Sequence, residues 1–121
     1  MELKKLTENF TVCKIPDMTQ VDLQDEFLFI GKTDEELSLV CRTSRTPGNY
    51  THREDGWKGF RIEGILDFSM VGILSRISAL LAENEIGIFV VSTFNTDYIL
   101  VKAENFARTL EKLEQSGYTV L

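Results

Sequence analysis

Polar side chains crowd one short segment of the C-terminal half, Ser92–Asp97, whose sequence is STFNTD. Ser92 and Thr93 continue a run of β-branched and aromatic residues typical of a strand, at positions where apolar side chains would be expected. Hydroxyl, amide and carboxyl groups gathered at one turn can hold the polar ends of a small molecule. The same residue types also form ordinary turns by hydrogen bonding to their own backbone, so both interpretations stay open.

A second candidate is the junction Asp67–Leu74, where a predicted strand gives way to a predicted helix. A helix start leaves backbone N–H groups without internal partners and carries a partial positive charge, so it can hold a carboxylate. Gly72 would let the backbone approach a ligand closely because it has no Cβ, and Asp67 could pair with an ammonium group. The alternative is a capped helix, in which Ser69 satisfies the N–H groups and Gly72 only packs against a sheet.

Other reactive residue types form no pattern typical of catalysis or metal binding. His52 is the only histidine, and no nucleophile lies near it in the sequence. Cys13 and Cys41 lie inside apolar runs and are expected to be buried free thiols, although a disulfide or a metal pair stays open. Without a nucleophile elbow, a P-loop, a Rossmann glycine pattern or a cluster of metal ligands, we expect no enzyme activity, no cofactor and no metal.

Hydrophobic periodicity predicts that alternating strands and helices position these residues in the C-terminal half. The predicted elements are a strand over 57–66, a helix over 70–85 that Ser69 caps and Asn84 ends, strands over 86–94 and 98–102, a helix over 105–115 that Gly117 follows, and a strand over 118–121. The order β-α-β-β-α-β is that of a ferredoxin-like unit.

The N-terminal half is predicted to be less regular. It contains a strand over 10–15, a short helix or loop over 18–24, and a hairpin with strands over 26–32 and 36–42. Four consecutive apolar residues, 27–30, indicate that the first hairpin strand is buried on both faces. Residues 50–56 are polar without a clear period and are expected to form a linker or a surface loop. This half could be a degenerate copy of the same unit.

Composition narrows the class of partner. The chain has 121 residues, of which 43% are hydrophobic, and a formal net charge of −6. A nucleic-acid partner is not expected because phosphate binding needs a clustered basic surface. No apolar run is long enough to span a membrane, and the N-terminus has no signal-peptide core, so we expect a cytoplasmic protein without a membrane partner.

Two stretches, Gly64–Ser75 and Ile88–Val101, together resemble the ACT domain, in particular the aspartokinase-type ACT units of small stand-alone bacterial proteins. The resemblance implies a regulatory module that binds an amino acid, usually where two ACT units meet, and a homodimer. It also implies that the ligand contacts the first strand-to-helix loop and the second strand with the hairpin after it. The corresponding ligand-binding residues here are Asp67, Phe68, Ser69, Met70, Val71, Gly72, Ile73, Ser92, Thr93, Phe94 and Asn95.

These inferences combine into an α+β fold of two tandem ACT-like, ferredoxin-like units with antiparallel sheets and helices packed on one face. We expect a reduced unit over 1–60 and an ACT domain over 61–121. The expected function is non-catalytic amino-acid sensing that acts through an unidentified partner. The alternatives are a ligand-independent dimerisation or protein-interaction module and, less favoured, an acylphosphatase-like enzyme, for which Arg61 and Arg76 are too isolated to form a phosphate cradle.

Overall fold

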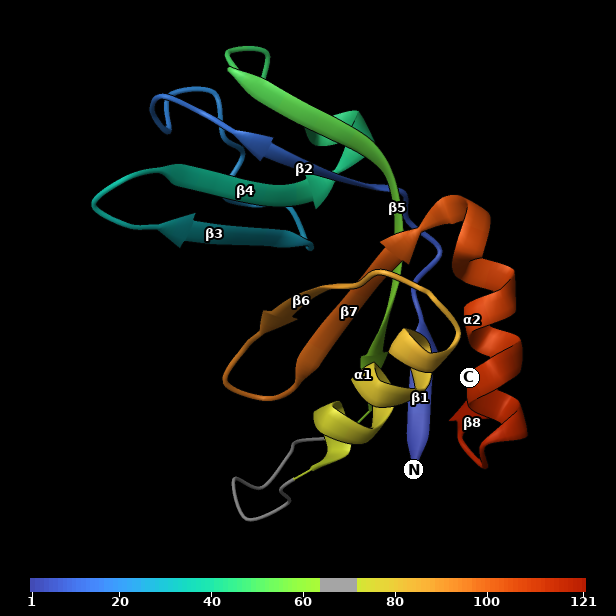
Figure 1. Ribbon diagram of the computed structural model, residues 1–121. Coiled ribbons are helices and arrows are strands. Elements are labelled where there is room, and N and C mark those ends of the chain that lie inside the picture. Colours follow the sequence, from blue (N-terminus) through green and yellow to red (C-terminus); the bar gives the residue numbers. More distant parts are fainter. Residues whose placement is uncertain (64–71) are drawn as a thin grey trace. The chain divides into compact units, whose positions relative to one another are not determined.

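The computed structural model describes residues 1–63 and 72–121, and the chain divides into two compact units (Figure 1). The N-terminal unit is Glu8–Trp57. The C-terminal unit combines Met1–Thr7 with Lys58–Leu121. Strand β5 crosses the boundary in the sequence, so residues 52–57 of that strand are described with the first unit and residues 58–62 with the second.

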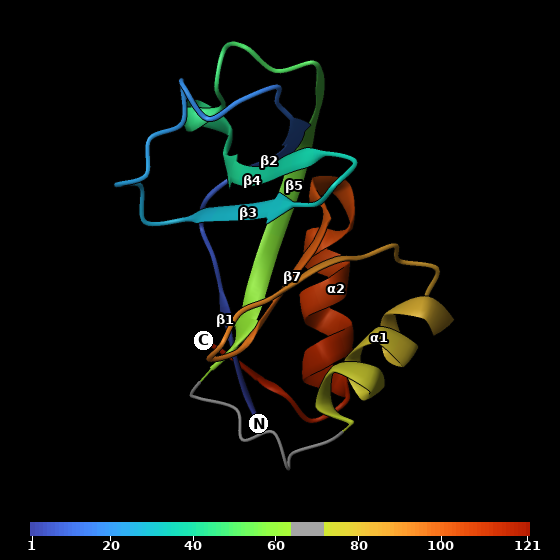
Figure 2. The same ribbon diagram turned by 90° about the vertical axis from the view of Figure 1, so that its left-hand side faces the viewer.

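The C-terminal unit is a mixed sheet with strand order β6–β7–β5–β1–β8, and its two α-helices lie on one face of that sheet (Figure 2). The elements are β1 (Glu2–Lys5), β5 (His52–Ile62), α1 (Ile73–Glu83), β6 (Phe89–Ser92), β7 (Asp97–Lys102), α2 (Ala103–Gln115) and β8 (Thr119–Val120). From β5 onward this is the predicted β-α-β-β-α-β order.

An apolar core between the helices and the sheet holds the C-terminal unit together. On α1, Ile73, Ile77 and Leu81 recur at every fourth residue and are buried, which is the stripe that the helical period predicts. They pack in one cluster with Phe60 of β5 and Ile99 of β7. Full burial of an aliphatic or aromatic side chain is worth about 1.5–3 kcal/mol, so this cluster is the main source of stability in the unit.

The helix ends agree with the sequence analysis, but the start of α1 does not. Asn84 is the C-cap of α1, and Gly117 follows α2 with a φ of 97°, as predicted. The N-cap of α1 is Gly72, with a φ of 89°. The left-handed Gly72 sets the start of α1 at Ile73, three residues later than predicted. The predicted cap, Ser69, lies outside the described residues.

Strand β1 was not predicted, and it changes both the sheet and the division of the chain. It pairs antiparallel with β5 and parallel with β8, so it separates two strands that would otherwise be neighbours in a ferredoxin-like order and makes the sheet mixed rather than antiparallel. The predicted boundary between residues 60 and 61 places the two units one after the other in the sequence. In the structure Met1–Thr7 lies with the C-terminal unit because β1 forms its hydrogen bonds there.

The N-terminal unit is a sheet with strand order β3–β4–β2–β5. Its other elements are β2 (Phe10–Lys14), β3 (Leu28–Lys32), β4 (Leu37–Arg42) and a short 3-10 helix, η1 (Thr43–Arg45). A small core of Cys13, Ile15, Leu39 and Cys41 lies on one face. Within Glu8–Trp57, all of which the structure describes, no α-helix forms, and the residues predicted as a short helix or loop, 18–24, form turns.

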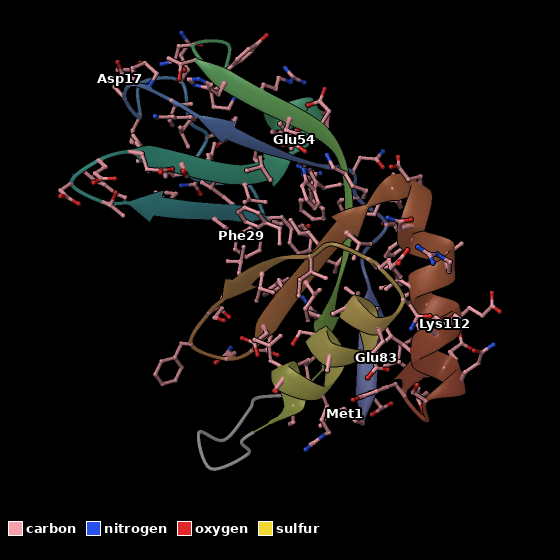
Figure 3. The ribbon with its side chains drawn as sticks, in the orientation of Figure 1. Met1, Asp17, Phe29, Glu54, Glu83 and Lys112 are labelled. Atoms are coloured by element: carbon pink, nitrogen blue, oxygen red, sulfur yellow. The ribbon has the colours of Figure 1, made fainter. Side chains whose placement is uncertain are left out.

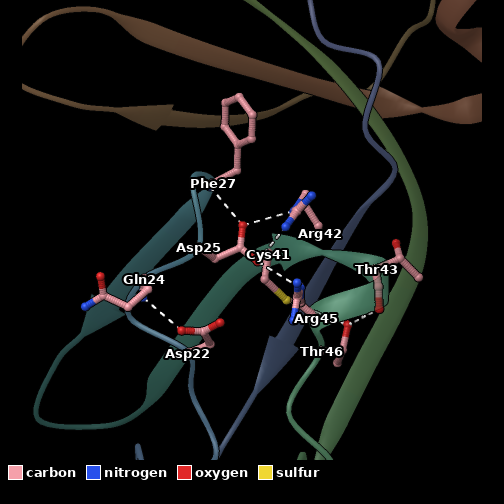
Figure 4. Close-up of polar contacts among 9 residues, drawn as sticks. All are labelled: Asp22, Gln24, Asp25, Phe27, Cys41, Arg42, Thr43, Arg45 and Thr46. Carbon is pink, nitrogen blue, oxygen red and sulfur yellow. Dashed lines mark hydrogen bonds and ion pairs between the residues drawn. The ribbon is translucent and has the colours of Figure 1, made fainter.

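A buried carboxylate closes the long loop of this unit (Figure 4). The Asp25 side chain is only 3% exposed, and its two oxygens accept hydrogen bonds from Arg42 Nε at 2.9 Å and Nη2 at 3.0 Å. Arg45 lies 3.5 Å away, and the backbone N–H of Phe27 donates at 3.3 Å. The Arg42 hydrogen bonds are the main reason that the pKa of Asp25 lies below its usual range, so the pair remains ionised. This network attaches the loop before β3 to the end of β4.

Two predictions for the N-terminal half are wrong. The apolar run before Gly31 does not indicate a strand buried on both faces: β3 is an edge strand, and Ile30 is 45% exposed. Residues 50–56 do not form only a loop, because β5 already begins at His52 and pairs with β2. Because this part of β5 is polar, its sequence does not show the alternation of apolar and polar residues that predicts a strand. Asp55 accepts a hydrogen bond at 2.7 Å from the buried Thr11, which gives this polar strand a specific contact.

No helix in the described part of the chain is long and apolar enough to cross a membrane.

Candidate functional site

The predicted segment Ser92–Asp97 forms the turn between β6 and β7. Ser92 Oγ donates to Asp97 Oδ1 at 2.6 Å across the hairpin. Thr93 and Thr96 close the turn: the Thr93 N–H donates to Thr96 O at 2.8 Å, and Thr93 Oγ1 donates to the same oxygen at 2.9 Å. Hydrogen bonds that form the turn therefore explain part of the polar composition of this segment, in agreement with the alternative interpretation of an ordinary turn. The Ser92–Asp97 pair is not needed to close the turn.

Thr96 attaches this turn to the strand that leads into the other predicted site segment. Its Oγ1 donates to the carbonyl oxygen of Ile62 at 2.7 Å, and the side chain is buried. Ile62 is the last residue of β5. The bond therefore ties the hairpin to the end of β5, directly before residues 64–71 in the chain.

The Ser92–Asp97 pair faces the helices. In the β6–β7 ladder Val90 lies opposite Ile99, and Ser92 lies opposite Asp97. Val90 and Ile99 pack in the core under the helices, and side chains two residues apart on a strand point to the same face. The hydroxyl and the carboxylate therefore project from the helix-bearing face at the end of the sheet. Figure 1 shows the β6–β7 turn and the start of α1 at this same end of the unit.

The start of α1 combines a left-handed glycine with a cationic side chain. Gly72 has no side chain that could cap the first turn, and its carbonyl accepts the N–H of Arg76 at 2.9 Å. An added Cβ at Gly72 would lie 3.1 Å from Nη1 of Arg76, so the guanidinium folds back over the glycine. This exposed guanidinium adds a full positive charge to the partial charge of the helix start. Arg76 also lines an open depression of about 320 Å³ with Leu80 and Tyr118.

The predicted site residues differ in what the structure says of them. Asp67, Phe68, Ser69, Met70 and Val71 lie outside the described residues. Gly72 and Ile73 begin α1, and Ile73 is buried in the core.

The remaining predicted residues belong to the hairpin. Ser92 and Thr93 make the bonds given above, Asn95 is exposed, and Phe94 is 83% exposed. The structure therefore brings Gly72 and the hairpin to one end of a single unit.

The list of predicted ligand-binding residues omits three residues of this region, Thr96, Asp97 and Arg76, although the candidate segment Ser92–Asp97 includes the first two. Asp97 could have been found, because a hairpin centred on residues 94 and 95 places it opposite Ser92. Arg76 could also have been found, since a side chain four residues after a helix start points back over the first turn. The contact between Thr96 and Ile62 spans 34 residues and has no signal in the sequence.

The described residues contain no group of three or more His, Cys, Asp or Glu side chains that could hold a metal ion. Both cysteines are buried free thiols. Burial raises the pKa of Cys13 to about 11, with a further contribution from the neighbouring Cys41. A thiol with so high a pKa is a poor nucleophile at neutral pH.

Comparison with known proteins places these features in a family. A family model described as ACT domain matches residues 52–115. The crystal structure of protein Atu0741 from Agobacterium tumefaciens is 32% identical to the chain, with a TM-score of 0.87, over 99% of this chain and 91% of that one. No curated protein sequence matches significantly.

Two more distant structures share the fold. VC0802 from Vibrio cholerae, described as a protein of unknown function and possible transport protein, is 18% identical, with a TM-score of 0.74, over 94% of this chain and 88% of that one. The regulatory subunit of aspartate kinase from Thermus thermophilus is 8% identical, with a TM-score of 0.68, over 95% of this chain and 96% of that one. The fold is thus α+β, with a tandem ACT-like arrangement that matches an aspartate kinase regulatory subunit.

Proposed function

The chain belongs to the ACT domain family, and from that premise we propose that it is a non-catalytic regulatory protein that binds a free amino acid. Family membership supports small-molecule binding. The choice of an amino acid rests on the opposite charges that the C-terminal unit presents at one end of its sheet. We further propose that the protein acts in the cytoplasm as a homodimer.

The start of α1 is the proposed carboxylate site. Its first-turn N–H groups have no partners within the helix, and Gly72 leaves room for close approach. Arg76 adds a cation beside the glycine. An amino-acid carboxylate would satisfy these groups. Asp67 and Ser69 remain predicted contacts from the preceding segment.

The observation that carries the proposal is the Ser92–Asp97 pair on the helix-bearing face. A carboxylate is an acceptor only, and it pairs well with an ammonium group. A zwitterion between the two sites would place its ammonium at Asp97 and its carboxylate at Gly72. Thr96 supports this geometry because it holds the hairpin against the end of β5.

Binding regulates only if the ligand favours one arrangement of the protein over another. We propose that the bound amino acid changes how the protein meets a second copy or another protein.

The test is a thermal-shift screen of the full chain against the twenty amino acids and their biosynthetic relatives. A ligand at 100 times its dissociation constant stabilises the folded state by about 2.7 kcal/mol. We expect Asp97→Asn and Arg76→Gln to abolish a selective shift, and Asp67→Ala and Ser69→Ala to weaken it. Glu114→Gln, which changes an exposed carboxylate on α2, is the matched control and should retain the shift.

One observation favours the interaction module as a second function. Phe94 is 83% exposed at the tip of the hairpin, and aromatic residues are enriched at protein interfaces. If no amino acid shifts the melting temperature at millimolar concentration while a dimer persists, the ligand proposal fails and the interaction module takes its place. A selective shift that Asp97→Asn leaves unchanged would instead show a ligand site elsewhere.

A further inference from the structure

Helix α1 carries its end charges in the order opposite to the one that the helix dipole favours. Arg76 follows directly after the first turn, and Glu83 is the last residue of the helix (Figure 3). The first turn contains no acidic residue, and the last turn contains no basic one. Because a helix start is partially positive and a helix end partially negative, both charges are unfavourable for α1 alone. Helix α2 has the usual arrangement, with Glu104 in its first turn and Lys112 in its last.

Neither charge is neutralised within the described part of the chain. The Arg76 guanidinium folds back over Gly72, so its charge lies at the helix start. Among the described residues neither Arg76 nor Glu83 takes part in an ion pair. Arg108 of α2 donates to the carbonyl oxygen of Asn84, just beyond α1, at 3.0 Å, but it does not pair with Glu83. The start of α1 is therefore suited to an added anion, and its end to an added cation.

The two charges lie along one open groove on the helix-bearing face. This α1 groove is a depression of about 320 Å³, lined by Arg76, Ala79, Leu80 and Glu83 of α1 and by Ser116 and Tyr118 after α2. The four α1 residues share one side of the helix, since positions three, four and seven apart are neighbours on its surface. Arg76 and Glu83 are about 10 Å apart along the axis, and Ala79 and Leu80 lie between them in the chain. The groove is suited to a helix with an apolar middle and opposite charges at its two ends.

A second α1 packed antiparallel has these properties. A two-fold axis between positions 79 and 80 places Glu83 of each copy beside Arg76 of the other. Each pair brings an anion to a helix start and a cation to a helix end, so the charges then agree with the dipoles of both helices. Ala79, which is exposed, lies next to the axis, and its small side chain lets the two helices approach closely.

We propose that the α1 groove is the interface for a second copy of this chain, whose α1 lies antiparallel in it with Glu83 paired to Arg76. The interface is isologous, since each copy uses the same residues. A contact limited to one helix face from each copy is small, so the dimer is weak and forms at micromolar or higher concentration.

The dimer interface and the proposed amino-acid site share Arg76. Two carboxylates beside one guanidinium repel each other, so a bound amino acid weakens the dimer, a consequence that rests on the proposed function. Different variants separate the two proposals. Glu83→Arg removes the dimer contact and leaves the Ser92–Asp97 pair in place, whereas Asp97→Asn should abolish ligand binding and leave the dimer unchanged.

Charge exchange tests the register. Sedimentation velocity of the full chain should show a concentration-dependent dimer. Glu83→Arg and Arg76→Glu each turn two attractive pairs into two repulsive ones and should weaken association about tenfold or more. The double exchange should restore it, and this rescue requires a second copy because the two positions are about 10 Å apart on one helix. Glu114→Arg, a charge reversal at an exposed position of α2, is the matched control and should leave association unchanged.

Thermal unfolding shows whether a variant loses the dimer or the fold. Circular dichroism at a concentration too low for the dimer measures the stability of one copy. Glu83→Arg and Arg76→Glu each give α1 a charge that its dipole favours, so their melting temperatures should equal or exceed that of the wild type. A lower melting temperature would show that the native charge already has a favourable partner within one copy and would overturn the proposal.

Cross-linking tests the axis independently. Helix axes about 8–10 Å apart place the Cα atoms of residue 79 in the two copies about 4–5 Å apart, within disulfide range, so Ala79→Cys should cross-link. Ala82→Cys is the control, because positions 82 of the two copies would be about 8 Å apart along the helices. The native cysteines are buried and should not contribute. A monomer at hundreds of micromolar, a double exchange without rescue, or equal cross-linking of the two cysteine variants would overturn the proposal.

Discussion

Replacing Asp25 by asparagine tests how the N-terminal unit holds its long loop without an α-helix. The substitution keeps the shape of the side chain and one acceptor oxygen but removes the charge that Arg42 binds at 2.9 and 3.0 Å. Hydrogen bonds to a charged group are worth about 1.5–3 kcal/mol, more than neutral ones. Arg42 and Arg45 are 30% and 55% exposed, so water can solvate both cations after the change. We therefore expect a loss of about 2 kcal/mol, below the cost of a fully buried broken pair.

Urea unfolding followed by the fluorescence of Trp57 measures this loss, because Trp57 is the only tryptophan and belongs to the N-terminal unit. The matched control is Asp22→Asn, three residues earlier in the same loop. Asp22 is exposed and accepts the backbone N–H of Gln24 at 2.9 Å. Asparagine forms the same turn, so the control should unfold at the wild-type urea concentration.

The dependence of stability on pH tests whether the charge of Asp25 causes the difference between wild type and Asp25→Asn. The pKa of Asp25 in the folded protein lies below its usual range, mainly because of the hydrogen bonds from Arg42. A carboxyl with a lowered folded pKa contributes stability that is present above its unfolded pKa of about 3.9 and is lost as the pH falls through the folded value. The difference between wild type and Asp25→Asn should be constant from pH 5 to 7 and shrink below about pH 4. Equal stabilities at pH 7, or a difference that persists below both pKa values, would refute the reasoning.

Three further predictions concern the packing of both units. Thr96→Val should lower the free energy of unfolding of the C-terminal unit by about 1 kcal/mol, because it removes the hydrogen bond to Ile62. Helical circular dichroism measures this loss, since both α-helices belong to that unit. An unchanged stability would show that the hairpin is held by its strands alone. Gly59→Ala should destabilise the same unit by at least about 1 kcal/mol, since its Cβ would lie 3.1 Å from a backbone carbonyl oxygen of β7, and a stable variant would show that β7 can shift. Cys13 and Cys41 should resist alkylation at pH 8 until urea unfolds the protein, because both are buried and their pKa values are raised; rapid labelling under native conditions would contradict that burial.

Local patterns in the sequence were sufficient to predict most of the C-terminal unit. The four-residue spacing of Ile73, Ile77 and Leu81 predicts one apolar helix face because 3.6 residues make a turn. Asn84 and Gly117 end their helices through backbone preferences that act within a few residues. The element order, and with it the ferredoxin-like unit, follows from such short-range signals.

The errors occurred where the partner of a segment lies far away in the chain. Strand β1 contributes Leu3 to the core, but a four-residue strand with one buried side chain has no readable period. Residues 52–55 are polar on both faces and form a strand only because β2 supplies hydrogen bonds to their backbone. The apolar residues before Gly31 suggested a central strand, whereas only the pairing order shows that β3 lies at an edge.

The candidate site, like the fold, could be predicted from the sequence only in part. The sequence by itself identified Gly72 and the polar run Ser92–Asp97, because residue types at a helix start and at a turn have local physical meaning. Only the tertiary structure decided that Asp97 faces the helices and that Thr96 bonds to the end of β5. Those facts depend on which face of the sheet the helices cover and on a contact between residues far apart in the chain, which no local pattern encodes.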